Sequence, residues 1–305
     1  MTQTWTTLGV LDWTTKRFGE RNISSARLEA QVLLAHVLAC TRVQLYTAFD
    51  KPLAEAELAS FRELIRRRLA GEPLAYLVGE TEFWSLPFYV DPSVLVPRPD
   101  SETVIEVAVK LRGTSGERRT GSSAEGDAEV DAKAAACRVL DLCTGSGILA
   151  ISLARELPAA RVIATELSPE AAAVARRNAD RNAVADRVDV RVGDLFAPVA
   201  GEPPFDLIVG NPPYIATATI ATLSAEVHRE PALALDGGGD GLAFYDRIAA
   251  AARDHLAPGG AIVLEHGFDQ ADAVRKRLTD AGLVDVELTC DLARNPRVTS
   301  ARRAP

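Results

Sequence analysis

The four residues best suited to chemistry are consecutive: Asn211-Pro212-Pro213-Tyr214. They follow an apolar segment at residues 205–210 that is typical of a buried parallel strand, and ligands of open α/β sheets bind beyond the carboxyl ends of such strands. The prolines remove two N–H donors, so the backbone at these positions offers hydrogen-bond acceptors but no donors. Asn211 adds a side-chain acceptor and Tyr214 a flat apolar surface, which together suit a planar NH2 group. A simple Asn-Pro turn is the alternative, and the tetrapeptide alone does not decide between the two.

A second candidate site lies upstream, where Cys137–Gly147 is typical of a strand followed by a glycine-containing turn. A helical pattern follows at residues 148–157, and this arrangement brings a nucleotide-like ligand close to backbone N–H groups. Only Gly145 and Gly147 are glycine, so the loop differs from the G-x-G-x-x-G of dinucleotide-binding folds and from a phosphate-binding loop. Glu166 ends the next apolar segment, at a spacing from which a carboxylate accepts hydrogen bonds from both ribose hydroxyls.

In this order, the glycine loop, the carboxylate and the tetrapeptide resemble the class I methyltransferases that use S-adenosylmethionine (SAM). Further motifs narrow the resemblance to the HemK/PrmC family. They are Glu72-Pro73-Leu74-Ala75-Tyr76-Leu77-Val78-Gly79-Glu80 with Glu82-Phe83-Trp84, Leu95-Val96-Pro97-Arg98-Pro99-Asp100-Ser101-Glu102, Arg229-Glu230-Pro231 with Ala234-Leu235, Leu264-Glu265-His266-Gly267, and Asn295-Pro296-Arg297-Val298. That family methylates N5 of the glutamine in the Gly-Gly-Gln loop of peptide-chain release factors. The resemblance covers nearly the whole chain except residues around 113–136, and it implies SAM as the cofactor and a release factor as the protein partner.

Methylation of a carboxamide constrains how the substrate is held. The amide nitrogen is a poor nucleophile because its lone pair is delocalised, so it has to be fixed close to the methyl group with that lone pair aimed at it. We expect Asn211 Oδ1 and the Pro212 carbonyl to accept the two amide hydrogens and to stabilise the positive charge that develops on nitrogen, while Tyr214 packs on the amide. The predicted catalytic and substrate-binding residues are therefore Asn211, Pro212, Pro213 and Tyr214.

A larger set of residues is predicted to hold the cofactor. They are Asp141, Cys143, Thr144, Gly145, Ser146, Gly147, Glu166, Asp194, Leu195 and Asn211. Two alternatives stay open for Asp141, which either orients the loop or contacts the methionine amine, or simply caps the turn. Asp194 ends a strand and is expected near the adenine, whereas the family places an adenine-contacting residue one position later, at Leu195. Cys143 stands where such loops usually carry glycine, and a positive φ there would strain the cysteine backbone.

Composition and charge favour a cytoplasmic enzyme. The chain has 305 residues, of which 47% are apolar, enough for two domains with sizeable cores. Its net charge of −8 argues against nucleic acid as a direct partner, and the basic run Arg66-Arg67-Arg68 is predicted to be a solvated helix face. No apolar segment is long enough to span a bilayer, no signal peptide is recognisable, and no membrane partner is expected. The cysteines at 40, 137, 143 and 290 lack zinc-site spacing, which indicates free thiols and no metal.

Periodicity and turn residues divide the chain into three regions. Residues 1–73 are predicted to form a small helical substrate-docking domain, residues 74–99 a bridge with a hairpin between Tyr76 and Val90, and residues 100–305 the methyltransferase domain. The apolar face of one N-terminal helix is expected to contain Leu28, Val32, Leu33 and Val37, and that of a later helix Leu58, Phe61, Leu64, Ile65 and Leu69.

The third region alternates strands with helices, which predicts an α/β fold with a doubly wound sheet. Parallel strands are expected at 139–142, 162–165, 188–192, 207–209 and 262–265, with an antiparallel edge pair at 284–288 and 297–299. Together they give the seven-stranded Rossmann-like arrangement that the resemblance also implies. Residues 113–136 contain almost no large apolar side chain and are expected to form a flexible insertion.

The sequence therefore predicts a SAM-dependent protein-glutamine N5-methyltransferase that acts on release factors. One alternative is methylation of a glutamine on a ribosomal protein, because a related family shares the tetrapeptide. Another is N6-adenine methylation of nucleic acid, since adenine N6 is also a planar conjugated NH2 group; the acidic total and the lack of a basic, aromatic-rich segment disfavour it. A binding protein that has lost turnover is the third alternative, and the intact tetrapeptide argues against it.

Overall fold

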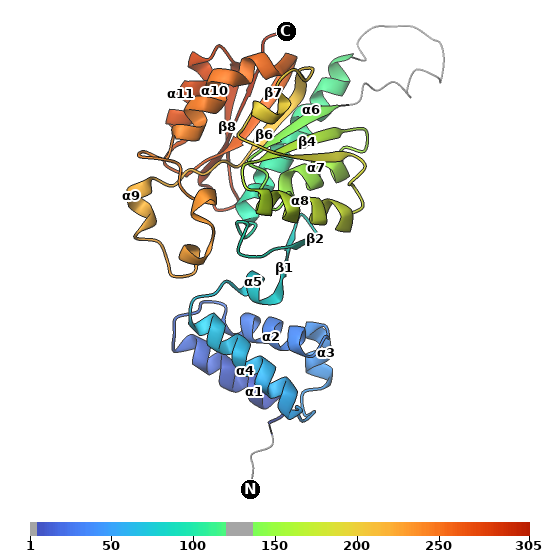
Figure 1. The fold of residues 1–305 in the computed structure, drawn as a ribbon, viewed down its shortest axis with the longest axis vertical. Coiled ribbons are helices and arrows are strands. Elements are labelled where there is room, and N and C mark those ends of the chain that lie inside the picture. Colours follow the sequence, from blue (N-terminus) through green and yellow to red (C-terminus); the bar gives the residue numbers. More distant parts are fainter. Residues whose placement is uncertain (1–4, 120–136) are drawn as a thin grey trace, which may run out of the picture. The chain divides into compact units, whose positions relative to one another are not determined.

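The computed structural model describes residues 5–119 and 137–305, except for the side chains of residues 113–119 (Figure 1). The chain divides into two compact units. The first comprises Met1–Glu80 and Ser224–Arg229, and the second comprises Thr81–Leu223 and Glu230–Pro305. The boundaries predicted at residues 73 and 99 thus lie on either side of the division at Glu80.

The first unit is a bundle of helices that share one apolar core. Its helices are α1 (Thr7–Gly19), α2 (Ala26–Val37), α3 (Arg42–Thr47), α4 (Glu55–Leu69) and α5 (Leu74–Val78). Phe18, Leu33 and Leu34 are fully buried at its centre. Helix α4 buries Leu58 and Phe61 from the face that its periodicity predicts, because residues three and four apart lie on one side of a helix.

The predicted face of α2 was wrong for Leu28, which is 42% exposed. The buried face instead carries Glu29, Ala30 and Leu34 beside Leu33. A stretch in which apolar residues are so closely spaced is compatible with more than one helical stripe. On the observed stripe the buried carboxylate of Glu29 pairs with Arg68.

The interpretation of Arg66-Arg67-Arg68 as a solvated face was wrong at its last residue. The Arg68 side chain is 7% exposed and its Nε lies 2.5 Å from a carboxylate oxygen of Glu29, while its NH2 group lies 3.0 Å from Glu226. Arg66 and Arg67 pair with carboxylates near the surface, where ion pairs contribute little. Arg68 therefore joins α2, α4 and the segment Ser224–Arg229 within the first unit.

A short hairpin leads into the second unit. Its strands are β1 (Glu80–Phe83) and β2 (Leu86–Tyr89), and they pair with each other in a two-stranded sheet. The bridging hairpin is confirmed, but it begins later than predicted, because Tyr76 lies in helix α5 rather than in a strand. Phe83 and Phe88 are buried in the core of the second unit, with their rings packed edge to face.

The second unit contains the predicted seven-stranded sheet. Its strands are β3 (Arg138–Leu142), β4 (Arg161–Glu166), β5 (Val188–Val192), β6 (Phe205–Gly210), β7 (Leu256–Glu265), β8 (Val284–Cys290) and β9 (Pro296–Arg302). In the described part of the chain the order is β5-β4-β3-β6-β7-β9-β8, with β9 antiparallel to both of its neighbours and the other pairs parallel.

Helices cover both faces of this sheet (Figure 1). They are α6 (Glu102–Arg119), α7 (Ile148–Glu156), α8 (Pro169–Arg181), α10 (Ala243–His255) and α11 (Ala271–Asp280), with the short helix α9 (Thr217–Ile220) in a loop. Alternate residues of β3 show the two cores: Val139 packs with α6, α7 and α8, whereas Leu140 packs with α10 and α11.

The predicted flexible insertion at 113–136 overlaps the end of α6, whose backbone is helical to Arg119. Its remaining residues, 120–136, lie outside the described part of the chain. No helix of the described residues is long and apolar enough to cross a membrane.

Candidate active site

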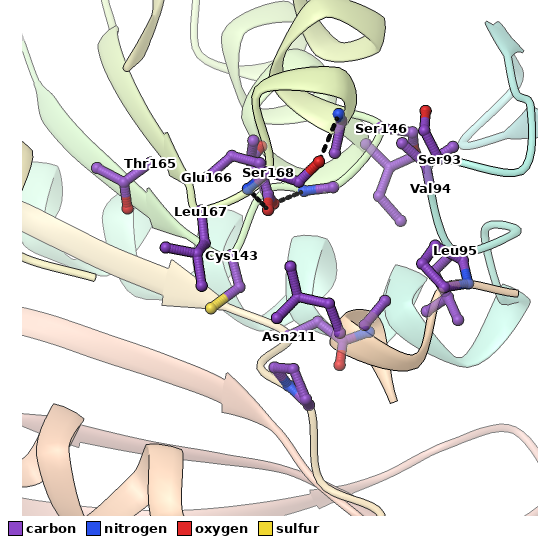
Figure 2. Close-up of a pocket in the computed structure, with 18 of the residues that line it drawn as sticks. Ser93, Val94, Leu95, Cys143, Ser146, Thr165, Glu166, Leu167, Ser168 and Asn211 are labelled. Atoms are coloured by element: carbon purple, nitrogen blue, oxygen red, sulfur yellow. Dashed lines mark hydrogen bonds between the residues drawn. The ribbon is translucent and has the colours of Figure 1, made fainter. Parts of the chain in front are cut away.

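The two predicted site segments meet at one edge of the sheet. Strand β3 pairs with β4 on one side and with β6 on the other, and Leu142 and Gly210 are partners at the ends of β3 and β6. The chain leaves these strands in different directions, which opens a crevice at the carboxyl edge where ligands of such folds bind. A cavity of about 310 Å³ lies there, and both Cys143 and Asn211 line it (Figure 2).

Most of the predicted cofactor residues line this cavity. They are Cys143, Thr144, Gly145, Ser146, Glu166, Asp194, Leu195 and Asn211. Asp141 and Gly147 do not, because Asp141 is fully buried and Gly147 is the N-cap residue of the packed helix α7. Among the four predicted catalytic residues, Asn211 and Pro213 line the cavity, whereas Pro212 and Tyr214 are not in its wall.

The loop after β3 is a tight backbone structure rather than an open turn. Three of its residues have positive φ, namely Cys143 (58°), Gly145 (54°) and Gly147 (88°). The Thr144 N–H donates to the Thr165 carbonyl at 3.1 Å, which ties the loop to the end of β4. A Cβ added to Gly145 would meet no atom within 4 Å, so this glycine serves backbone conformation.

Asp141 supports this loop from below. Its Oδ2 accepts hydrogen bonds from Thr144 Oγ1 at 2.5 Å and from the Ala150 N–H at 3.1 Å. The residue is fully buried, and burial raises the pKa of its carboxyl group to about 7. Of the alternatives left open by the sequence, these contacts favour orientation of the loop and of the first turn of α7.

Glu166 joins the two loops that border the cavity. One carboxylate oxygen accepts a hydrogen bond from the Gly145 N–H at 2.9 Å and the other accepts one from the Ser168 N–H at 3.0 Å (Figure 2). A carboxylate has about four lone-pair sites, so about two remain for hydroxyl groups of a ligand. The side chain is mostly buried but faces the cavity, which suits a carboxylate that binds a diol.

The loop after β5 contributes a polar and an apolar residue. Asp194 is half-buried and forms an ion pair with Arg247, whereas Leu195 is 6% exposed and packs into the core. Both residues line the cavity, so the structure brings the strand-end carboxylate and the following residue to the same wall.

The tetrapeptide after β6 has its amide directed by a neighbour. Asn211 Nδ2 donates to Ser101 Oγ at 3.1 Å, and Pro212 and Pro213 are buried. Tyr214 is partly buried and packs against the core, and burial raises the pKa of its hydroxyl group to about 12. The Tyr214 carbonyl accepts from Gln270 Nε2 at 2.9 Å, which fixes the end of the tetrapeptide.

Comparison with known proteins places both units in families. Residues 9–79 match the model of the PrmC N-terminal domain, and residues 128–282 match that of the methyltransferase small domain. A release factor glutamine methyltransferase of Geobacter sulfurreducens is 44% identical over 293 residues, which cover 96% of this chain and 93% of the relative. The chain belongs to the release factor glutamine methyltransferase family.

Another relative confirms this assignment, and a solved structure agrees on the fold. The release factor glutamine methyltransferase of Chlorobaculum tepidum is 41% identical and covers 94% of each chain. The catalytic domain of hMettl16 in complex with the MAT2A 3'UTR hairpin 6 is 17% identical, with a TM-score of 0.56, and covers 84% of this chain and 96% of that one. At this identity the second likeness shows the fold alone.

The sequence interpretation missed two further segments that line the cavity. Ser93, Val94, Leu95, Pro97, Arg98 and Ser101 line it from the segment before α6, and Pro231, Leu233 and Ala234 line it from a later loop. Arg98 and the fully buried Glu230 side chain form an ion pair at 2.6 Å, which joins these two segments. The motifs at 95–102 and 229–235 were the available signal, but they carried no assigned role.

No group of three His, Cys, Asp or Glu side chains in the described ranges is arranged as a metal site. The cavity is instead lined by backbone amides, a few carboxylates and apolar side chains.

Cys143 has a positive φ and occupies the position where such loops usually carry glycine. We expect Cys143→Gly to be more stable than Cys143→Ala by about 0.5–1 kcal/mol, because left-handed backbone costs roughly 1–2 kcal/mol with a Cβ and glycine loses only part of that in entropy. Both variants lack the thiol, so their difference isolates the backbone. Chemical denaturation monitored by circular dichroism measures it, and an equal or greater stability of Cys143→Ala would exclude strain at this position.

Proposed function

We propose that this protein transfers a methyl group from SAM to the side-chain amide nitrogen, N5, of the glutamine in the Gly-Gly-Gln loop of peptide-chain release factors. The observation that carries the proposal is the position of Asn211, beside the glycine loop in one cavity and with Nδ2 already engaged by Ser101. The names of relatives that are 41–44% identical over most of the chain support the substrate.

The residues present fit SAM as the methyl donor. Glu166 has acceptor capacity left for two ribose hydroxyls after its two backbone contacts, and Asp194 and Leu195 lie on the same wall for the adenine. The loop from Cys143 to Ser146 would hold the remaining part of the cofactor, and its conformation is maintained by Asp141. When bound, SAM supplies an electrophilic methyl group.

The substrate amide is assigned to Asn211 and Pro212. Asn211 Oδ1 and the Pro212 carbonyl would accept its two hydrogens, since Nδ2 of Asn211 points to Ser101 and proline has no N–H. Acceptors that are fixed before reaction stabilise the positive charge that develops on the nitrogen. Pro213 forms part of the cavity wall, and Tyr214 supports the loop by packing against the core.

The N-terminal helices are assigned to docking of the protein substrate. The first unit matches a domain model specific to the family, and it has exposed apolar residues on α3 and directly after it, among them Val43, Tyr46 and Phe49. A release factor is thus the proposed partner, without nucleic acid or membrane. Translation termination takes place in the cytoplasm, so the proposal includes that location.

Labelled SAM with candidate acceptors tests the proposal. We expect label in a release factor with an intact Gly-Gly-Gln loop, and mass spectrometry should place one methyl group on that glutamine. A release factor whose loop glutamine is replaced by alanine is the matched control and should stay unlabelled. Transfer to a ribosomal protein or to adenine-containing nucleic acid instead, with none to the release factor, would contradict the proposed substrate.

A further inference from the structure

Two residues outside the tetrapeptide, Ser101 and Glu265, interact with the side chain of Asn211. Ser101 lies at the end of the short 3-10 helix at Pro99–Ser101, and its Oγ accepts the hydrogen bond from Asn211 Nδ2. Glu265 is the last residue of β7, which lies next to β6, with Leu264 opposite Gly210. Asn211 directly follows Gly210, and Glu265 directly follows Leu264, so the two residues occupy corresponding positions at the ends of neighbouring strands. Both side chains interact with Ser101.

The side chains of Ser101 and Asn211 both interact with the Glu265 carboxyl group and favour its ionised form. It is 1% exposed, and its Oε2 has no partner among the described residues. Burial raises the pKa of Glu265 to about 7, while Ser101, Arg297 and Asn211 favour the ionised carboxylate. A buried carboxylate is costly unless donors satisfy it, and Ser101 and Asn211 are two side chains that can donate to it.

The direction of these hydrogen bonds determines which end of the Asn211 amide can reach the cavity. If Ser101 accepts from Nδ2, its own hydroxyl hydrogen is left to donate to Glu265, so the contacts run from amide to hydroxyl to carboxylate. An amide rotated by half a turn would place Oδ1 against these groups and present NH2 to a substrate NH2. Two donors cannot bond to each other, so only one rotamer of the amide can accept.

We propose that Ser101 and Glu265 are positioning residues, which hold the Asn211 amide in the rotamer that presents Oδ1 to the substrate. This inference rests on the proposed function, in which Asn211 accepts a hydrogen of the substrate amide. The carboxylate touches neither substrate nor cofactor and acts through Asn211. Arg297, whose NH2 group lies 3.3 Å from Asp100 and 3.4 Å from Asp291, supplies positive charge that favours the ionised form of Glu265.

A double-mutant cycle tests this assignment. Glu265→Gln keeps the shape but adds a donor next to Ser101, and Ser101→Ala removes the intermediate hydroxyl. Each should lower the single-turnover rate of methyl transfer about tenfold and leave SAM affinity within a few-fold of the wild type. In an Asn211→Ala background, Glu265→Gln should produce no further loss, because the group it positions is gone.

The matched control is Ser152→Ala, which removes another fully buried serine hydroxyl, one without a partner among the described residues, on α7. It should react at the wild-type rate. The positioning role would be overturned if Glu265→Gln lowered the single-turnover rate by the same factor in the wild type and in Asn211→Ala, or lowered it in neither. In both cases Asn211→Ala alone would still be slower than the wild type. A wild-type rate for Asn211→Ala would instead contradict the proposed function, on which this inference depends.

Discussion

Asn211→Ala is expected to lower the rate of methyl transfer about 10²–10³-fold, the loss that typically follows removal of one preorganised contact to developing charge. SAM should still bind within a few-fold of wild-type affinity, because the glycine loop and Glu166 remain intact. Docking of the release factor should change little, since the first unit is unaltered. The variant thus separates positioning of the substrate nitrogen from binding of either partner.

Single-turnover transfer with both substrates saturating is the decisive measurement, and calorimetry gives the SAM affinity in parallel. Asn295→Ala is the matched control: Asn295 is exposed between β8 and β9, and among the described residues its side chain bonds only to Asp291. It should react at the wild-type rate. If Asn211→Ala also did so, the hydrogen-bonding role of the tetrapeptide would be excluded, whatever its position in the cavity.

Asn211→Asp extends this prediction, because Ser101 and Glu265 both interact with the Asn211 side chain. The aspartate replaces the donor to Ser101 with an oxygen and brings a second carboxyl group close to buried Glu265. When two carboxyl groups share one site, the pKa of one of them rises. The pair then either retains a proton or, if both groups are ionised, pushes the two side chains apart. Retaining an acceptor oxygen should therefore not restore activity, and the rate should stay well below that of the wild type.

The sheet could be predicted from the sequence because its strands are continuous apolar segments that end in chemically distinctive residues. Leu207, Ile208 and Val209 are all fully buried, as expected for a strand covered on both faces, and Asn211 follows directly. Strand ends meet at one edge of a parallel sheet, so the glycine loop and the tetrapeptide could be placed together without coordinates.

Other features depend on contacts that no local pattern records. Arg68 resembles its exposed neighbours in sequence, yet it is buried by carboxylates that come from 39 and 158 residues away. The hydrogen bond between Ser101 and Asn211 likewise spans 110 residues. Tyr214 was expected in the site from its chemistry, but its side chain packs against the core and is not part of the cavity wall. Side-chain direction in a loop is set by such packing.

Glu166→Ala is expected to raise the SAM dissociation constant about tenfold to a hundredfold, since hydrogen bonds to a charged group contribute on the order of 1.5–3 kcal/mol. Turnover at saturating SAM should fall much less, because Asn211 is untouched. Calorimetry measures the affinity. Glu170→Ala is the matched control, as it removes an exposed carboxylate from the same cavity and leaves the glycine loop unaltered, so its affinity should stay within a few-fold.

The alanine variant removes two things at once, because Glu166 also accepts from the backbone of Gly145 and Ser168. A SAM analogue without the two ribose hydroxyls separates them. If the loss comes from the ribose, the wild type and Glu166→Ala should bind this analogue with similar affinity. If the carboxylate instead mainly maintains the loop, the variant should remain weaker for the analogue by the same factor as for SAM. Unchanged affinity for SAM itself would assign the ribose to another residue.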